Sequence, residues 1–81
     1  MNAITAKYLS KDQEWSNETT TYWFLIEGDS DLSGKVFGVA ESGPTSAVLD
    51  SDGAPLDYSE HDLNRVTKYC VVTDEMRMGS K

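Results

Sequence analysis

Apolar and polar residues alternate along much of the first half of the chain, and this two-residue period is typical of β-strands. The clearest case is Thr19 to Glu27, where Thr, Tyr, Trp and Phe residues favour a pleated surface. Both faces of this segment are apolar at its centre, because Phe24 lies between Trp23 and Leu25. We therefore predict a strand here, in the middle of a sheet.

Three further segments show the same alternation, and turn-forming residues separate them. The predicted strands are Ile4 to Leu9, Lys35 to Ala40, and Ser46 to Asp50. The polar stretch between the first two strands is predicted as a loop. Asp52-Gly53 is a strong signal for a hairpin turn, and Gly38 suits a bulge or a close approach of another group to the backbone.

The C-terminal third gives a mixed signal. Its only helix candidate is a short one near residues 59–65, where Asp57 with Glu60, or Ser59 with Asp62, fits an N-terminal capping pattern. Val66 to Thr73 is rich in β-branched residues, which predicts a final strand, and a helix that continues through Cys70 is the alternative. Residues 74–81 are predicted as a mobile tail.

Together these elements predict a mainly β fold, a β-rich α+β domain built as an antiparallel meander of four to five strands with one short helix. The domain spans residues 1–73, in line with a chain of 81 residues. Closure into a small SH3-like or OB-like barrel would hide the sheet edges. An open sheet with the helix across one face is the alternative.

Charge is distributed unevenly along the chain. Between Asp12 and Asp62 there are twelve carboxylates and one cation, Lys35, so this span carries −11 in a molecule of net charge −7. Phosphate binding needs clustered Lys and Arg, so we expect no direct contact with nucleic acid, and an anionic membrane surface is disfavoured for the same reason. Basic proteins are the partners that this charge favours.

The single cysteine, Cys70, excludes an internal disulfide and is predicted to be a small buried hydrophobic side chain. The N-terminal residues lack the pattern of a signal peptide. The longest apolar run, Tyr22 to Ile26, is far shorter than a membrane span. We therefore expect a cytoplasmic protein.

No motif specifies a reaction, and we expect no enzymatic activity. His61 is the only histidine, and between Glu60 and Asp62 it should be solvated. Asp29 to Val36 resembles the first half of an EF-hand calcium loop, with oxygen ligands at alternate positions. However, the position of the bidentate glutamate falls on Ala40. A hairpin turn is the preferred interpretation, and we expect no metal or cofactor.

The predicted partner-binding surface consists of the acids of two turns and one tryptophan. In an antiparallel meander, alternate turns emerge at the same end of the sheet, so the turns after the second and fourth strands should bring their carboxylates together. A tryptophan in a polar loop fits an interface anchor. The predicted residues are Glu27, Asp29, Asp31, Asp50, Asp52, Asp57 and Trp15.

Small acidic domains without catalytic motifs are typical of phage-encoded inhibitors, such as anti-CRISPR and anti-restriction proteins. One DNA strand carries about nine charges over roughly 30 Å, which the local charge of −11 is sufficient to imitate. We therefore expect an inhibitor from a phage or mobile element that docks on a basic nucleic-acid-binding protein by partial mimicry. The alternatives are a small homo-oligomeric assembly module, whose acids only solubilise it, and an enzyme-like module that binds calcium or a small molecule.

Overall fold

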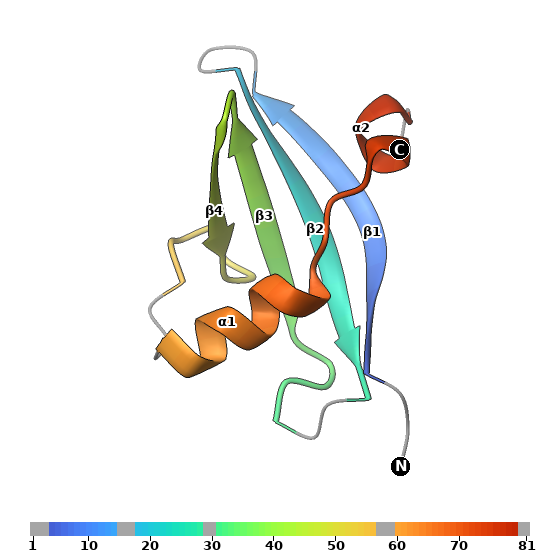
Figure 1. The fold of residues 1–81 in the computed structure, drawn as a ribbon, viewed down its shortest axis with the longest axis vertical. Coiled ribbons are helices and arrows are strands. Elements are labelled where there is room, and N and C mark those ends of the chain that lie inside the picture. Colours follow the sequence, from blue (N-terminus) through green and yellow to red (C-terminus); the bar gives the residue numbers. More distant parts are fainter. Residues whose placement is uncertain (1–3, 15–17, 29–30, 57–59, 80–81) are drawn as a thin grey trace.

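The computed structural model describes residues 4–14, 18–28, 31–56 and 60–79, with the backbone alone at 60–62. Four strands form one antiparallel sheet in the order β1-β2-β3-β4, so each strand pairs with the next one in the chain (Figure 1). The elements are β1 (Thr5–Glu14), β2 (Thr19–Glu27), β3 (Val36–Ser42), β4 (Thr45–Leu49), α1 (Glu60–Tyr69) and α2 (Asp74–Met78). The predicted mainly β meander is confirmed. The sheet is open, with β1 and β4 at its edges, so the open-sheet alternative holds rather than the barrel.

Strand β1 is longer than predicted. It continues through the stretch predicted as a loop and ends with Glu14 opposite Thr19 of β2. The register shifts between Tyr8 and Ser10, which marks a β-bulge. A bulge adds one residue to one strand and so interrupts the two-residue period. For this reason the alternation is lost from the sequence after Leu9, although the strand continues.

One face of the sheet carries the core. Tyr22, Phe24 and Ile26 of β2 are buried on this face, as is Phe37, which lies opposite Phe24 on β3. On the other side of Phe24, Tyr8 of β1 places its ring centroid 5.7 Å from that of Phe24. Cross-strand aromatic pairs of this kind contribute about 0.2–1 kcal/mol each to sheet stability. Strands β1, β2 and β3 are therefore joined by side chains as well as by backbone hydrogen bonds.

Helix α1 packs on the core face, and the strand predicted over residues 66–73 is wrong. Val66 is 0% exposed and Cys70, about one helical turn later, is 4% exposed, so helical spacing brings both against the sheet. The hydroxyl of Thr67 donates to the carbonyl of Leu63 at 2.8 Å, a bond that suits a β-branched residue within a helix. Burial of the Val66 face thus outweighs the local preference for strand.

The segment predicted as a tail contains helix α2. The side chain of Thr73 accepts a hydrogen bond from the N–H of Met76 at 3.3 Å and so caps the start of the helix. Lys11 of β1 donates through Nζ to the carbonyls of Met76 at 3.1 Å and Arg77 at 2.9 Å. A cation is favourable at the carbonyl end of a helix, so α2 is attached to β1. A threonine followed by two acids was the signal for this helix in the sequence.

Candidate functional site

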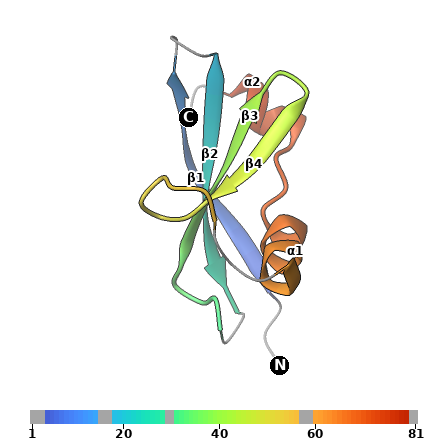
Figure 2. The ribbon, with the colours of Figure 1, turned by 90° about the vertical axis from the view of Figure 1, so that its left-hand side faces the viewer.

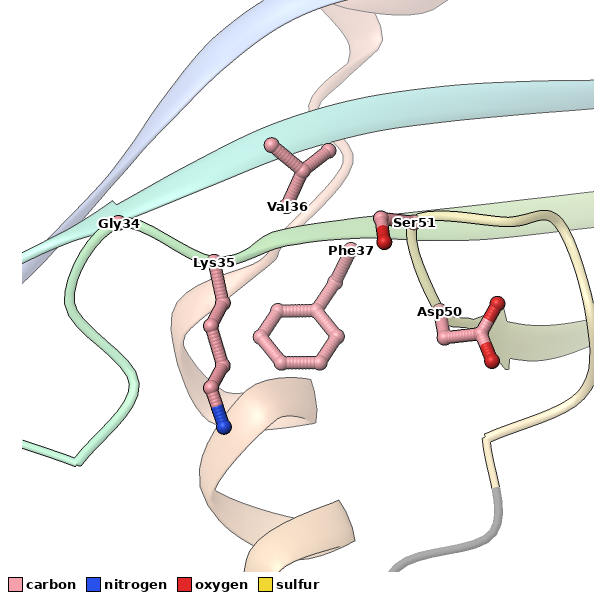
Figure 3. Close-up of a pocket in the computed structure, with 6 residues that line it drawn as sticks. All are labelled: Gly34, Lys35, Val36, Phe37, Asp50 and Ser51. Carbon is pink, nitrogen blue, oxygen red and sulfur yellow. The ribbon is translucent and has the colours of Figure 1, made fainter.

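Two turns meet near one end of the sheet. The connection between β2 and β3 and the turn after β4 together line a hollow of about 370 Å³ (Figure 3). Its lining residues are Gly34, Lys35, Val36, Phe37, Asp50 and Ser51. Each turn supplies one charged group to this hollow, Lys35 from the first and Asp50 from the second.

Gly34 and Leu32 fix the connection between β2 and β3. Gly34 has a φ of +84°, in the left-handed region that favours glycine. Its N–H donates to the carbonyl of Ile26, and the N–H of Ile26 donates to the carbonyl of Lys35, both at 3.0 Å. This is the pattern of a bulge with glycine at its first position. Leu32 is 3% exposed and belongs to the core, so it holds the connection against the body of the protein.

The segment that resembles half of a calcium loop is thus a connection between two antiparallel strands. Asp31, 74% exposed at its side chain, has Oδ2 3.4 Å from Nη1 of Arg65 on α1. An ion pair this exposed contributes about 0–1 kcal/mol. Asp29 lies outside the described residues. Within the part of the chain that the structure describes, no three His, Cys, Asp or Glu side chains are grouped so that they could hold a metal ion.

The carboxylate of Asp50 builds the turn after β4. Its Oδ1 accepts hydrogen bonds from the N–H groups of Asp52 at 2.9 Å and Ala54 at 3.0 Å, the arrangement by which Asp stabilises tight turns. The chain then returns to form a single bridge between Leu49 and Pro55 rather than a further strand. Asp50 therefore has a structural role in addition to the binding role predicted for it.

The remaining predicted acids of the two turns are exposed. Glu27 ends β2, and Asp52 lies in the turn after β4. With Asp31 and Asp50 they place four carboxylates in two neighbouring turns, where Lys35 is the only cation among the described residues of those turns. Three predicted site residues lie outside the described residues: Asp29, Asp57 and Trp15. The side chain of His61 also lies outside them.

Glu41 of β3 is engaged by a cation instead. Arg77 donates from Nε to Oε1 of Glu41 at 3.1 Å and from Nη2 to Oε2 at 2.9 Å, and its Nη1 donates to Asp74 at 2.8 Å. Hydrogen bonding by the guanidinium lowers the pKa of Glu41. This carboxylate therefore connects α2 to the sheet.

Cys70 lines a second hollow of about 390 Å³, together with residues of β3, β4 and α1 such as Val39, Val48 and Leu63. Its predicted burial is confirmed, at 4% exposure. Loss of solvent raises the pKa of the thiol to about 11. The side chain is therefore protonated at neutral pH, and a protonated thiol is a poor nucleophile and metal ligand.

The sheet face away from the helices carries a surface that the sequence prediction missed. Both helices lie on one side of the sheet, and the loop that follows β4 projects on the other (Figure 2). On this open face the indole Nε1 of Trp23 donates to Oδ2 of Asp12 at 3.0 Å. A Cβ added at Gly38 would meet the Trp23 ring at 2.8 Å, so the close approach predicted at Gly38 is confirmed. The apolar character of both faces of β2 was the signal for this surface.

None of the described helices has the length and apolar character needed to cross a membrane. Comparisons of the chain with protein-family models, with curated proteins and with solved structures find no match.

Proposed function

We propose that the protein is an acidic binding module without catalytic activity of its own, which inhibits a basic nucleic-acid-binding protein by occupying part of its nucleic-acid groove. The observation that carries the proposal is the juxtaposition of two acidic turns around one hollow. Four carboxylates belong to these turns, from Glu27, Asp31, Asp50 and Asp52. A small acidic protein of this kind fits an inhibitor encoded by a phage or mobile element, of the anti-CRISPR or anti-restriction type.

The charge pattern supports a role in association. Exposed carboxylates on one end of a small molecule attract Lys- and Arg-lined grooves and orient the encounter. Such attraction is screened by salt, since the Debye length falls from about 10 Å at 0.1 M to about 3 Å at 1 M. Inhibition through the two turns should therefore weaken strongly as the salt concentration rises.

Displacement of nucleic acid tests the proposal. A panel of basic nucleic-acid-binding proteins, including CRISPR effectors and restriction enzymes, is loaded with fluorescent DNA, and release is followed by fluorescence anisotropy at low and high salt. We expect the protein to release DNA from at least one panel member at low salt, without cleaving it, and to lose this effect at high salt. Retention of DNA by every panel member at low salt would contradict the proposal.

Matched variants locate the effect. The test variant neutralises three acids of the two turns, through Glu27→Gln, Asp31→Asn and Asp52→Asn. The control variant neutralises three acids outside both the two turns and the open strand face, through Glu18→Gln, Asp74→Asn and Glu75→Gln. Asp50 is left unchanged because its carboxylate builds the turn. We expect the test variant to lose at least about tenfold in inhibition and the control to lose far less. Equal losses would show that net charge, and not the two turns, governs binding.

A homo-oligomeric assembly module is the second candidate, and the open sheet face favours it. The register places Leu25, Val36 and Leu49 on that face, where they are partly exposed, and both described helices lie on the other side of the sheet (Figure 2). Self-association through apolar sheet faces is a common route to oligomers. Light scattering over a range of protein concentrations tests this candidate, because a mass that stays monomeric at high concentration contradicts it.

A further inference from the structure

The open face of the sheet is a continuous surface formed by all four strands. Cross-strand partners share a face, so the register defines its members: Trp23 lies opposite Gly38, and Gly38 lies opposite Leu49. One pair further along, Leu25 lies opposite Val36. Figure 3 shows Val36 pointing to the other side of β3 from Phe37 and Lys35. These apolar side chains are separate from the residues that pack against the buried core.

Trp23 is held in place at the centre of this face. Its ring lies against Gly38, close enough that a Cβ there would be 2.8 Å from Cζ3, 3.0 Å from Cε3 and 3.1 Å from Cγ2 of Thr21. Its indole N–H is bonded to Asp12 at 3.0 Å. A tryptophan fixed before binding loses little conformational entropy when a partner docks. Fixed aromatic side chains at the centre of a surface are typical binding hot spots.

Acids border this apolar centre. On β1, Asp12 lies opposite Thr21 and Glu14 opposite Thr19, so both carboxylates belong to the open face. Glu27 borders it at the other end of β2, and the turn built by Asp50 projects on the same side of the sheet (Figure 2). Among the described strand residues, Lys7, opposite Leu25, is the cation that the register places on this face.

From this arrangement we propose that the open face is the main contact surface for a partner protein, which presents an apolar centre surrounded by Lys and Arg side chains, with Trp23 as the anchor. The inference rests on the proposed function and names the chemistry of its partner surface. Apolar centres with polar rims are the usual anatomy of protein interfaces. The acidic rim selects a basic partner over a second copy, since two copies face to face would bring the same carboxylates together.

Short synthetic peptides separate the contributions of charge and apolar contact. One peptide alternates Lys with Leu, one alternates Lys with Ser, and one alternates Glu with Leu. Each is titrated into the ¹⁵N-labelled protein at low salt, and two-dimensional NMR follows the backbone amides and the indole N–H of Trp23, which Trp23→Phe identifies. We expect saturable shifts at Trp23, Leu25, Val36 and Leu49 with the Lys/Leu peptide, and much weaker binding of the other two peptides.

A matched pair of variants tests the assignment. Leu25→Thr with Val36→Thr removes apolar surface from the open face, and threonine, a β-branched residue, suits both strand positions. Val71→Ala with Met78→Ala removes apolar surface elsewhere, at side chains that are 56% and 86% exposed. Binding of the Lys/Leu peptide should weaken at least about tenfold in the first variant and stay within about twofold in the second. Circular dichroism confirms that both variants are folded.

Three outcomes overturn the inference. Shifts confined to the two acidic turns, with Trp23 and Leu25 unaffected, leave the proposed function standing and reject the open face. Concentration-dependent broadening of open-face signals without peptide, together with a dimeric mass, assigns the face to a second copy. Absence of salt-dependent binding by either Lys-containing peptide rejects the proposed function and the inference together.

Discussion

The indole ring of Trp23 lies directly against the backbone of Gly38, its partner on the neighbouring strand, so that a Cβ at residue 38 would stand 2.8 Å from Cζ3 of the ring. Side chains do not approach a real Cβ this closely, and the stiff indole cannot bend away as a flexible side chain would. The contact gives a reason for glycine in the middle of an otherwise apolar strand. The position of the Trp23 ring on the open face therefore depends on the absence of a side chain at residue 38.

The first prediction is that Gly38→Ala lowers the free energy of unfolding by about 1–3 kcal/mol, because the added methyl group displaces the Trp23 ring. The direction of the change tests the contact. Without it, alanine at residue 38 would raise the free energy of unfolding by about 0.4–1 kcal/mol, because alanine restricts the unfolded chain more than glycine does. Urea unfolding followed by circular dichroism measures the change. Ser42→Ala, exposed on the same strand, is the control and should stay within about 0.5 kcal/mol. A stabilised Gly38→Ala protein would contradict the contact.

The second prediction separates two valines that are close in sequence. Val66 is 0% exposed on the face of α1 that packs on the sheet, whereas Val71, just beyond the helix, is 56% exposed. Val66→Ala should therefore lower the free energy of unfolding by about 2 kcal/mol through lost burial and a residual cavity. Val71→Ala should change it by less than about 0.5 kcal/mol. Urea midpoints of the two variants, measured side by side, test the placement of α1, and equal losses would be incompatible with it.

Strand β2 could be predicted with its bounds because its periodicity and its β-forming residues agree. Strand β1 was only half recognised, since the bulge after Tyr8 shifts its alternation by one residue. In α1 the β-branched residues indicate strand, and only the tertiary environment of Val66 shows that a helix buries it better. Helix α2 has 5 residues, too few to display a helical period.

The candidate site also has features that the sequence predicts and features that it does not. That alternate turns of a meander lie at one end follows from topology alone, so the neighbouring position of the two turns was accessible from the sequence. The hydrogen bonds of the Asp50 carboxylate were not predictable, because the sequence does not distinguish an acid that stabilises a turn from one that binds a partner. The open face was missed because β2 is apolar on both faces, and the sequence does not say which face receives the helices.

The third prediction concerns acid stability. The hydrogen bonds from Arg77 lower the pKa of Glu41 from its ordinary value of 4.5. Around and below that value the unfolded chain therefore binds more protons than the folded one, so the stabilisation from this pair is present above it and is lost as the pH falls through the lowered pKa. Glu41→Gln should reduce stability at pH 7 and make little difference at pH 2. Urea unfolding across this range tests it, with Glu75→Gln as the control, and a pH-independent difference would refute the assignment.

The fourth prediction concerns the thiol of Cys70. With its pKa raised to about 11 by burial, about one molecule in a thousand carries a thiolate at pH 8, and the side chain is shielded from solvent. A thiol-specific chromogenic reagent should therefore modify the native protein far more slowly than the protein unfolded in urea at the same pH. The rate should rise with urea in step with unfolding. Rapid modification of the native protein would show that Cys70 is accessible.

The order of elements along the chain has a consequence for biosynthesis. Each strand pairs with its sequence neighbour, so the hairpins involve local contacts and should form quickly. Ribosomes release the N-terminal part of a chain first, at about 5–20 residues per second, and both helices follow all four strands. The nascent sheet is therefore two-sided, with apolar residues on both faces and no cover on either. Residues 60–79 arrive last and cover one of these faces, so the molecule acquires both its buried core and its open face in this final step.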